Sequence, residues 1–217
     1  GQVLAVAPGV GGRGRPIAGQ SGGSPQRGKL ANAVRLPQSR AYYRRRLHRA
    51  WGANWVVHHI RRSAELVSRR HPSVHKLAIG DISAKKGGPI SEHVSHQSGR
   101  DVDLGFYFKK KPGGYPKTFV KATKGNLHFR ATWALLTSLA ATKGADGGVE
   151  SMYISYDVQK LLYRAAKADG VSKKVLSRML QYPRGEDALA GIIRHEPGHD
   201  DHVHVRFGCP KKDRRCR

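Results

Sequence analysis

The segment from Asp201 to Phe207 alternates polar and apolar residues, and this pattern restricts the possible fold more than any other feature of the chain. A period of two is the period of a β-strand, so His202, His204 and Arg206 are expected on one face. The apolar residues between them then face the opposite side. The sequence therefore predicts a strand that packs on a core with its back and presents two imidazoles on its front.

A second segment has the same pattern. Asp101 and Asp103 fall on one face of an expected strand, and Gly99 marks a turn that delivers His96 to the same region. Two such strands can converge on one ion. Imidazole and carboxylate together suit zinc, and three protein ligands leave the fourth position open to water, as a catalytic zinc site requires. The residues alone leave open whether Asp101 or Asp103 is the ligand.

The length of 217 residues favours one compact domain, which we expect over residues 29–217. Residues 1–28 are rich in Gly, Pro, Ser and Arg and lack sustained periodicity, which predicts a flexible leader. No apolar run approaches the roughly 20 residues of a membrane span, and no signal-peptide pattern opens the chain. If the protein is exported, we expect this sequence to be its mature form.

The chain is strongly basic, with 40 Lys and Arg against 15 Asp and Glu and a formal charge of +25. Such a charge indicates an anionic partner: nucleic acid, anionic lipid or an acidic wall polymer. Residues 31–51 interleave aromatic and basic side chains, most densely from Tyr42 to Arg46. An alternative hypothesis is therefore a nucleic-acid-binding protein, or a nuclease, with a His/Asp metal site.

Helical and strand periodicities alternate along the chain and predict an α+β fold. Helices are expected at 54–70, at 126–143, after Asp157 and at 172–181, with Asn54 and Asp157 as N-caps. Strands are expected at 75–82 and 149–155. His58 and His59 are predicted to be surface or packing residues. The expected buried positions of the last three helices are Phe129, Trp133, Leu136 and Ala140; Val158, Leu161, Leu162 and Ala165; and Val175, Leu176 and Met179.

The run from His195 to His199 matches the His-Glu-x-x-His pattern of another class of zinc proteases. That pattern binds metal only on a helix, where histidines four apart share a face. Pro197 and Gly198 disfavour a helix interior. We therefore predict a loop that brings His199 to the edge of the site.

Three stretches together resemble the penicillin-insensitive murein endopeptidases: Gly80–Ser83, Ser95–Asp103 and His202–Pro210. These belong to the LAS group of zinc peptidases, with the D-Ala-D-Ala metallopeptidases and the hedgehog-like folds. The motifs of the group are His, six residues, Asp, and His-x-His. The resemblance implies a small antiparallel sheet that carries the site, flanked by about four helices. It also implies one zinc ion per chain with the ligands His96, Asp103 and His204.

The same resemblance implies hydrolysis of the D-alanyl–diamino acid crosslink of peptidoglycan, the expected partner, with nucleic acid bound only non-specifically through charge. His202 is expected to take the proton of the attacking water and pass it to the leaving amine. His93 and His199 are expected near the metal, where either could polarise the carbonyl or stabilise its oxyanion.

Cys209 and Cys216 are the two cysteines of the chain. Two thiolates alone make an incomplete zinc site, no Cys-x-x-Cys motif is present, and the family has a disulfide at this position. A disulfide between them is expected, which indicates an oxidising compartment, periplasmic or extracellular.

Overall fold

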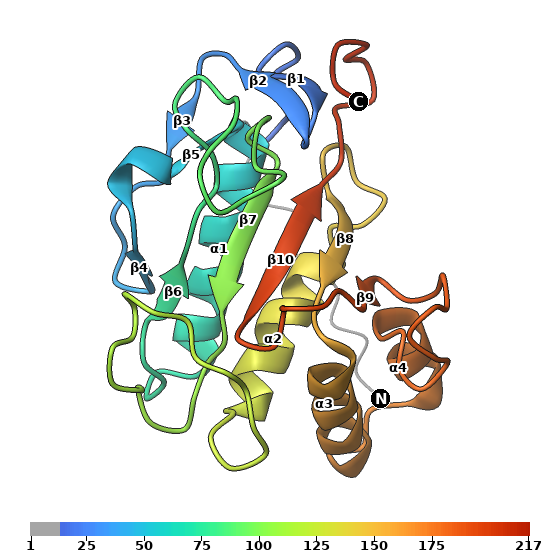
Figure 1. Ribbon diagram of the computed structural model, residues 1–217. Helices are drawn as coiled ribbons and strands as arrows, with labels where there is room; N and C mark the ends of the chain where they lie inside the picture. The colour runs from blue at the N-terminus through green and yellow to red at the C-terminus, as the bar shows by residue number, and fades with distance from the viewer. Residues whose placement is uncertain (1–13) are drawn as a thin grey trace.

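The computed structural model describes residues 14–217, which form an α+β fold around a six-stranded sheet (Figure 1). The four inner strands are antiparallel, as predicted, whereas each edge strand runs parallel to its neighbour. Across the sheet the order is β4 (Tyr42–Arg44), β6 (Leu77–Ile79), β7 (Asp101–Gly105), β10 (His202–Phe207), β8 (Val149–Tyr153) and β9 (Ile193–Arg194).

One face of this sheet is covered by helices and the other is left to the loops that build the site. Figure 1 shows α1 (Asn54–Arg70) and α2 (Phe129–Ala140) behind the sheet, with α3 (Tyr156–Ala168) and α4 (Lys173–Met179) beside β8 and β9. The apolar residues of β7 and β10 point toward the helices and are fully buried: Val102, Leu104, Val203, Val205 and Phe207. The predicted alternation of both strands is therefore confirmed.

Helix α1 has the predicted bounds and the predicted amphipathic face, with Val56, Ile60 and Val67 buried. Its N-cap is Ala53 rather than Asn54. The side chain of Asn54 instead bonds the preceding segment, accepting from the amide of Ile17 and donating to the carbonyl of Arg15. The predicted cap was wrong because this distant backbone competes for the amide.

The buried face of α2 is rotated from the predicted one. Leu136 and Ala140 are buried as expected, but Phe129 and Trp133 are only partly buried. The remaining buried positions are Ala131, Thr132, Leu135 and Leu139. This helix packs on both α1 and α3 and is apolar over most of its surface, so periodicity alone does not fix which stripe faces inward.

The last two helices differ from the predicted ones, and α4 is shorter than the expected 172–181. Helix α3 begins after Ser155 rather than at a cap formed by Asp157, which lies in its first turn. Its residues Leu161 and Ala165 are partly exposed, because Gln159 and Ala166 take the buried positions beside Val158 and Leu162. In α4, Leu176 and Met179 are buried as expected, whereas Val175 is exposed.

Two small sheets lie outside the central one. The hairpin of β1 (Ser21–Ser24) and β2 (Arg27–Leu30) falls largely within the segment predicted to be a flexible leader. Its backbone bonds remote segments, with the amide of Gly23 donating to the carbonyl of Arg215. The absence of apolar periodicity misled the prediction here, since the two strands pair with each other through glycines and serines and are held by backbone bonds to remote segments. Residues 1–13 lie outside the described residues. The other small sheet pairs β3 (Val34–Arg35) with β5 (Trp51–Gly52), around the 3₁₀ turn Leu47–Arg49.

The predicted disulfide between Cys209 and Cys216 is present. No helix within residues 14–217 combines the length and apolar character needed to cross a membrane.

Candidate metal and catalytic site

The polar face of the central strands forms the floor of the site. In the register of β7 and β10, Asp103 lies opposite His204 and Asp101 lies opposite Arg206. His202 is opposite Gly105, two positions further along the same face. Because the strands are antiparallel neighbours, residues from two segments about 100 positions apart meet within one hydrogen-bonded pair of strands.

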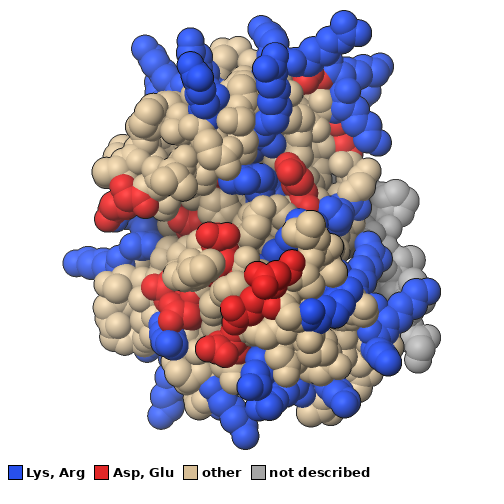
Figure 2. Space-filling view, turned by 45° about the vertical axis from the view of Figure 1, so that its right-hand side comes forward, with Lys and Arg blue, Asp and Glu red and all other residues tan. Residues whose placement is uncertain are grey.

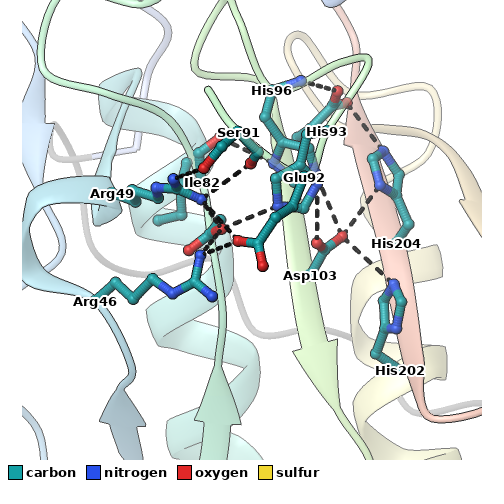
Figure 3. A network of polar contacts seen from close by, with 12 residues as sticks. Arg46, Arg49, Ile82, Ser91, Glu92, His93, His96, Asp103, His202 and His204 are labelled. Atoms are coloured by element: carbon teal, nitrogen blue, oxygen red, sulfur yellow. Dashed lines mark hydrogen bonds and ion pairs between the residues drawn. The ribbon is translucent and has the colours of Figure 1, made fainter. Parts of the chain in front are cut away.

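A loop before β7 adds His96, which is 1% exposed. His96 has a positive φ of 66°, and its amide donates to Asp101 Oδ2 at 3.1 Å. Its Nδ1 lies 3.0 Å from the carbonyl oxygen of Ile82. A carbonyl only accepts, so Nδ1 carries the proton and Nε2 of the neutral ring is left with a lone pair. The distance from His96 Nε2 to Asp103 Oδ1 is 3.3 Å (Figure 3).

The two aspartates have different partners. Both oxygens of Asp101 accept from Arg206, from Nε at 2.9 Å and from Nη2 at 3.2 Å. Burial acts to raise the pKa of Asp101, but its hydrogen bonds with His204 and Arg206 outweigh this and lower the pKa. Asp103 Oδ1, by contrast, is buried without a hydrogen-bond partner among the described residues. Both oxygens of Asp101 thus bond Arg206, whereas Oδ1 of Asp103 is available to bind a cation.

His204 lies between these carboxylates. Its Nδ1 is 3.1 Å from Asp103 Oδ1, and its Nε2 is 3.4 Å from Asp101 Oδ1. Burial lowers the pKa of His204, but the two carboxylates raise it further, to about 9. An environment that holds a proton this strongly equally favours a metal cation in the same place.

The donor atoms fit a divalent cation such as zinc. Among the described residues, His96 Nε2 and Asp103 Oδ1 are buried polar atoms without hydrogen-bond partners, and His204 presents Nδ1 to the same Asp103 oxygen. Two ligands bound at about 2.0 Å to a tetrahedral ion lie about 3.3 Å apart. The separations of Asp103 Oδ1 from His96 Nε2 and His204 Nδ1, 3.3 and 3.1 Å, match this spacing. Two overlapping groups place three ligand atoms mutually within 4.8 Å: His93, His96 and Asp103, and His96, Asp101 and His204.

His93 enters the site beside His96, with ring centroids 4.3 Å apart. Its Nε2 lies 2.9 Å from Asp81 Oδ2, and its Nδ1 faces Asp103 Oδ2 at 3.7 Å. Asp81 is itself fixed by Arg46 and Arg49. The contact with Asp81 sets the orientation of the His93 ring, which Figure 3 shows beside His96 and Asp103.

His202 and His199 form the other side of the site, with ring centroids 4.7 Å apart. The Nδ1 of His202 is 2.6 Å from Asp201 Oδ1, so its Nε2 faces the site, 3.8 Å from Asp103 Oδ1. His199 follows a turn in which Gly198 has a φ of 76°, so the segment from His195 is not a helix. Burial lowers the pKa of His199, which keeps its ring neutral. The structure thus brings all six predicted site residues together.

The site opens into a cavity of about 550 Å³. Several of its lining residues were not singled out from the sequence: Arg45, Arg46, Asp81, Glu92, Phe119 and Tyr153. The basic run containing Arg45 and Arg46 was noted only as a charged surface. Nothing in the sequence around Phe119 indicates a role, because this residue comes from a loop without periodicity.

Phe119 makes an unusual contact in this cavity. One face of its ring stacks on His202, with centroids 5.1 Å apart and planes 18° from parallel. The guanidinium of Arg45 lies 4.1 Å from the ring centroid. Two glycines of the sheet make room for it: a Cβ on Gly80 would come within 2.7 Å of Phe119, and one on Gly105 within 3.3 Å. The absence of side chains at Gly80 and Gly105 therefore leaves the space that the Phe119 ring occupies beside His202.

An α+β fold with a buried His/Asp cluster that could hold a metal ion, at the base of an open cavity, has the elements of a hydrolase site. Residues 21–217 match the family model described as penicillin-insensitive murein endopeptidase. The chain belongs to this family, and it is accordingly a peptidase of cell-wall murein.

Relatives bearing the same name agree with this assignment. The penicillin-insensitive murein endopeptidase of Pectobacterium atrosepticum is 29% identical over 93% of this chain and 69% of its own length. Those of Yersinia pestis and Yersinia enterocolitica are 26% identical over 93% of this chain and 71% of their own lengths. The predicted family is confirmed.

Proposed function

We propose that this murein endopeptidase depends on one zinc ion, held by His96, Asp103 and His204, and hydrolyses the D-alanyl–diamino acid crosslink of peptidoglycan. The observation that carries the proposal is Asp103 Oδ1, which is buried and unbonded between His96 Nε2 and His204 Nδ1. Two acceptor atoms facing each other across 3.3 Å need a cation or a proton between them. Zinc, when bound, would supply a Lewis acid and an activated water.

The residues around the cluster divide the remaining tasks. The carboxylate of Asp201 fixes the Nδ1 proton of His202, so Nε2 is free to accept the proton of the attacking water and pass it to the leaving amine. The Nδ1 of His199 donates to the carbonyl oxygen of Pro197, so in the neutral ring Nε2 is an acceptor that faces the same space and helps to position the attacking water in this proposal. His93, oriented by Asp81, lies on the opposite side and positions the ligand cluster.

The family assignment supports the peptidase over the nuclease considered from the sequence. The disulfide between Cys209 and Cys216 supports a periplasmic or extracellular location, where murein is accessible and thiols are oxidised. We therefore expect peptidoglycan to be the substrate and nucleic acid to bind only through charge.

Digestion of purified muropeptide dimers tests the proposal. Dimers crosslinked from D-alanine to the diamino acid (4–3) and dimers crosslinked between two diamino acids (3–3) are treated in parallel, and the products are identified by mass spectrometry. We expect 4–3 dimers to become monomers, a chelator to stop the reaction and zinc to restore it. Metal content, measured on the same samples, should fall from one zinc per chain to near zero in His204→Ala. His48→Ala is the matched control, because His48 is exposed and does not line the cavity. Zinc-independent cleavage, or full zinc in His204→Ala, would refute the proposed ligands.

A further inference from the structure

Nine exposed cationic side chains lie together at the end of the molecule formed by β1, β2 and the C-terminal segment. They come from three segments that are far apart in the sequence, and we call them the basic cap. The basic cap comprises Arg27, Lys29, Lys85, Lys86, Lys211, Lys212, Arg214, Arg215 and Arg217.

The backbone brings these segments together. The amide of Gly23 in the hairpin donates to the carbonyl of Arg215 at 2.7 Å, and the amide of Arg217 donates back to Gly23 at 3.0 Å. The amide of Leu30 donates to the carbonyl of Lys86 at 2.9 Å. The disulfide closes the C-terminal loop that carries four of the nine cations. The basic cap is therefore a built surface and not three separate mobile runs.

The charge of the basic cap is almost uncompensated. Residues 20–30, 84–88 and 209–217 contain one acidic residue, Asp213. Asp213 is 8% exposed, and its carboxylate accepts from the amides of Gly19 and Arg215. Among the ion pairs of residues 14–217, the basic cap contributes only Arg215, which is 3.9 Å from Asp213. Eight of its cations thus have no acidic partner within the part of the chain that the structure describes.

The position of the basic cap is distinct from the cavity but adjoins it. Figure 2 shows Lys and Arg side chains crowding the upper end of the molecule, while Asp and Glu side chains gather across the middle of the same face. The acidic residues that line the cavity include Glu92, Glu196 and Asp201. Gln26, in the turn of the β1–β2 hairpin, lines the cavity next to Arg27 of the basic cap. The cavity lining also includes Arg45, Arg46 and Arg206, so a long anion bound to the basic cap would lie beside the mouth of a cavity of mixed charge.

The chemistry of the basic cap indicates which anion it suits. Four of its cations are arginines, whose planar guanidinium matches the oxygens of a phosphate. The three segments contain no aromatic residue, and the neighbouring Trp51 ring already contacts two cations, Lys85 at 5.2 Å and Arg35 at 5.5 Å, so the basic cap offers few surfaces on which nucleic-acid bases would stack. We infer that the basic cap is a docking surface for the backbone of a phosphodiester polymer, independent of the metal and of peptidase activity.

Binding of labelled poly(glycerol phosphate), followed by fluorescence anisotropy at a series of salt concentrations, tests this inference. The cap variant carries four substitutions, Lys29→Gln, Lys86→Gln, Lys212→Gln and Arg214→Gln. The control variant removes the same charge from α3 and α4, by Arg164→Gln, Lys167→Gln, Lys173→Gln and Lys174→Gln. All eight side chains are exposed and none takes part in a hydrogen bond or ion pair among the described residues.

We expect the cap variant to bind at least tenfold more weakly at low salt. The slope of log affinity against log salt should fall by about three, since each phosphate contact contributes roughly 0.7 to 0.9. The control variant should stay within twofold of the wild type. Equal weakening in both variants would overturn the inference, because affinity would then follow net charge alone. An oligothymidylate of matched charge forms the second arm, and dependence on the basic cap seen only with that ligand would overturn the assignment to the backbone.

Discussion

Asp101 and Arg206 form a bidentate ion pair across β7 and β10, with both guanidinium contacts at or below 3.2 Å. The pair is buried on the carboxylate side, where Asp101 is 0% exposed. It also ties the strand pair to the loop, because Asp101 Oδ2 accepts from the amide of His96. The strands are thus locked in the register that sets Asp103 opposite His204.

The two aspartates should respond differently to the same substitution. Asp101→Asn leaves the Arg206 cation without its partner, and we expect the metal-free protein to lose about 3 kcal/mol of unfolding free energy. Asp103→Asn should cost less in the metal-free protein but abolish the stabilisation that zinc gives. Urea unfolding with chelator and with zinc measures both effects. A zinc-dependent stabilisation that survives Asp103→Asn would contradict the proposed ligand set.

The stability of the protein should depend on His59 below neutral pH. The His59 ring stacks on Phe207, with centroids 5.7 Å apart, and burial, followed by the charges of His58 and Arg62, lowers its pKa from 6.5 to about 4. Between those pH values the unfolded chain binds a proton that the folded chain does not. The free energy of unfolding that depends on a neutral His59 is therefore fully present above pH 6.5. It falls by at most about 3 kcal/mol as the pH falls toward 4.

The variant His59→Phe keeps an aromatic ring against Phe207 and removes this titration. Its unfolding free energy should therefore fall less steeply than that of the wild type between pH 6.5 and 4. Parallel curves for the two proteins, from denaturant unfolding at several pH values, would show that His59 does not titrate in this way.

Phe119 should act through His202 rather than through substrate affinity. Phe119→Leu removes the stacked ring, and Gly80→Ala forces the ring to shift, since the new Cβ would meet it at 2.7 Å. Each substitution should lower kcat about tenfold or more, because small displacements of a catalytic group are costly, and leave KM nearly unchanged. Gly113→Ala, where a Cβ meets nothing within 4 Å, is the control.

The double variant Gly80→Ala/Phe119→Leu tests whether both substitutions lower kcat by the same route, the displacement of the Phe119 ring. If Gly80→Ala acts by displacing the ring, it should have little further effect once Phe119 is leucine. Fully additive losses in kcat, measured on muropeptide dimers, would mean that the two residues act independently.

Removal of the disulfide should loosen the C-terminal loop. Replacement of Cys209 and Cys216 by serine removes a short closed loop from the unfolded chain and so raises its conformational entropy. We expect the free energy of unfolding to fall by about 2 kcal/mol. Urea unfolding of the double serine variant, with the reduced wild type beside it, provides the measurement. Because the loop lies away from the His/Asp cluster, zinc content should not change.

Most residues of the candidate site could be predicted from the sequence because their signals are local. Strand alternation places His202 with His204 and Asp101 with Asp103, and the structure confirms both faces. The separate roles of the two aspartates could not be deduced, since they depend on which residue of β10 lies opposite each. Phe119 was missed for a similar reason: its contacts are with residues far away in the sequence.

The same distinction explains the fold. Helix α1 was predicted with its full bounds because its apolar residues recur at helical spacing within one segment. The β1–β2 hairpin was missed because its glycines and serines carry no apolar pattern, and its partners lie near residues 86 and 215. In both cases the prediction extends only as far as the interactions within the segment itself.

The place of β10 in the sheet has a consequence for the order of assembly. This strand is among the last segments of the chain, yet it lies between β7 and β8 at the centre of the sheet. A chain that ends before residue 202 has two parts of the sheet with no strand between them, and it lacks His202 and His204, two of the five histidines of the site. A polypeptide that lacks β10 is therefore unable to form the candidate site, which is assembled only once this strand has been added to the sheet.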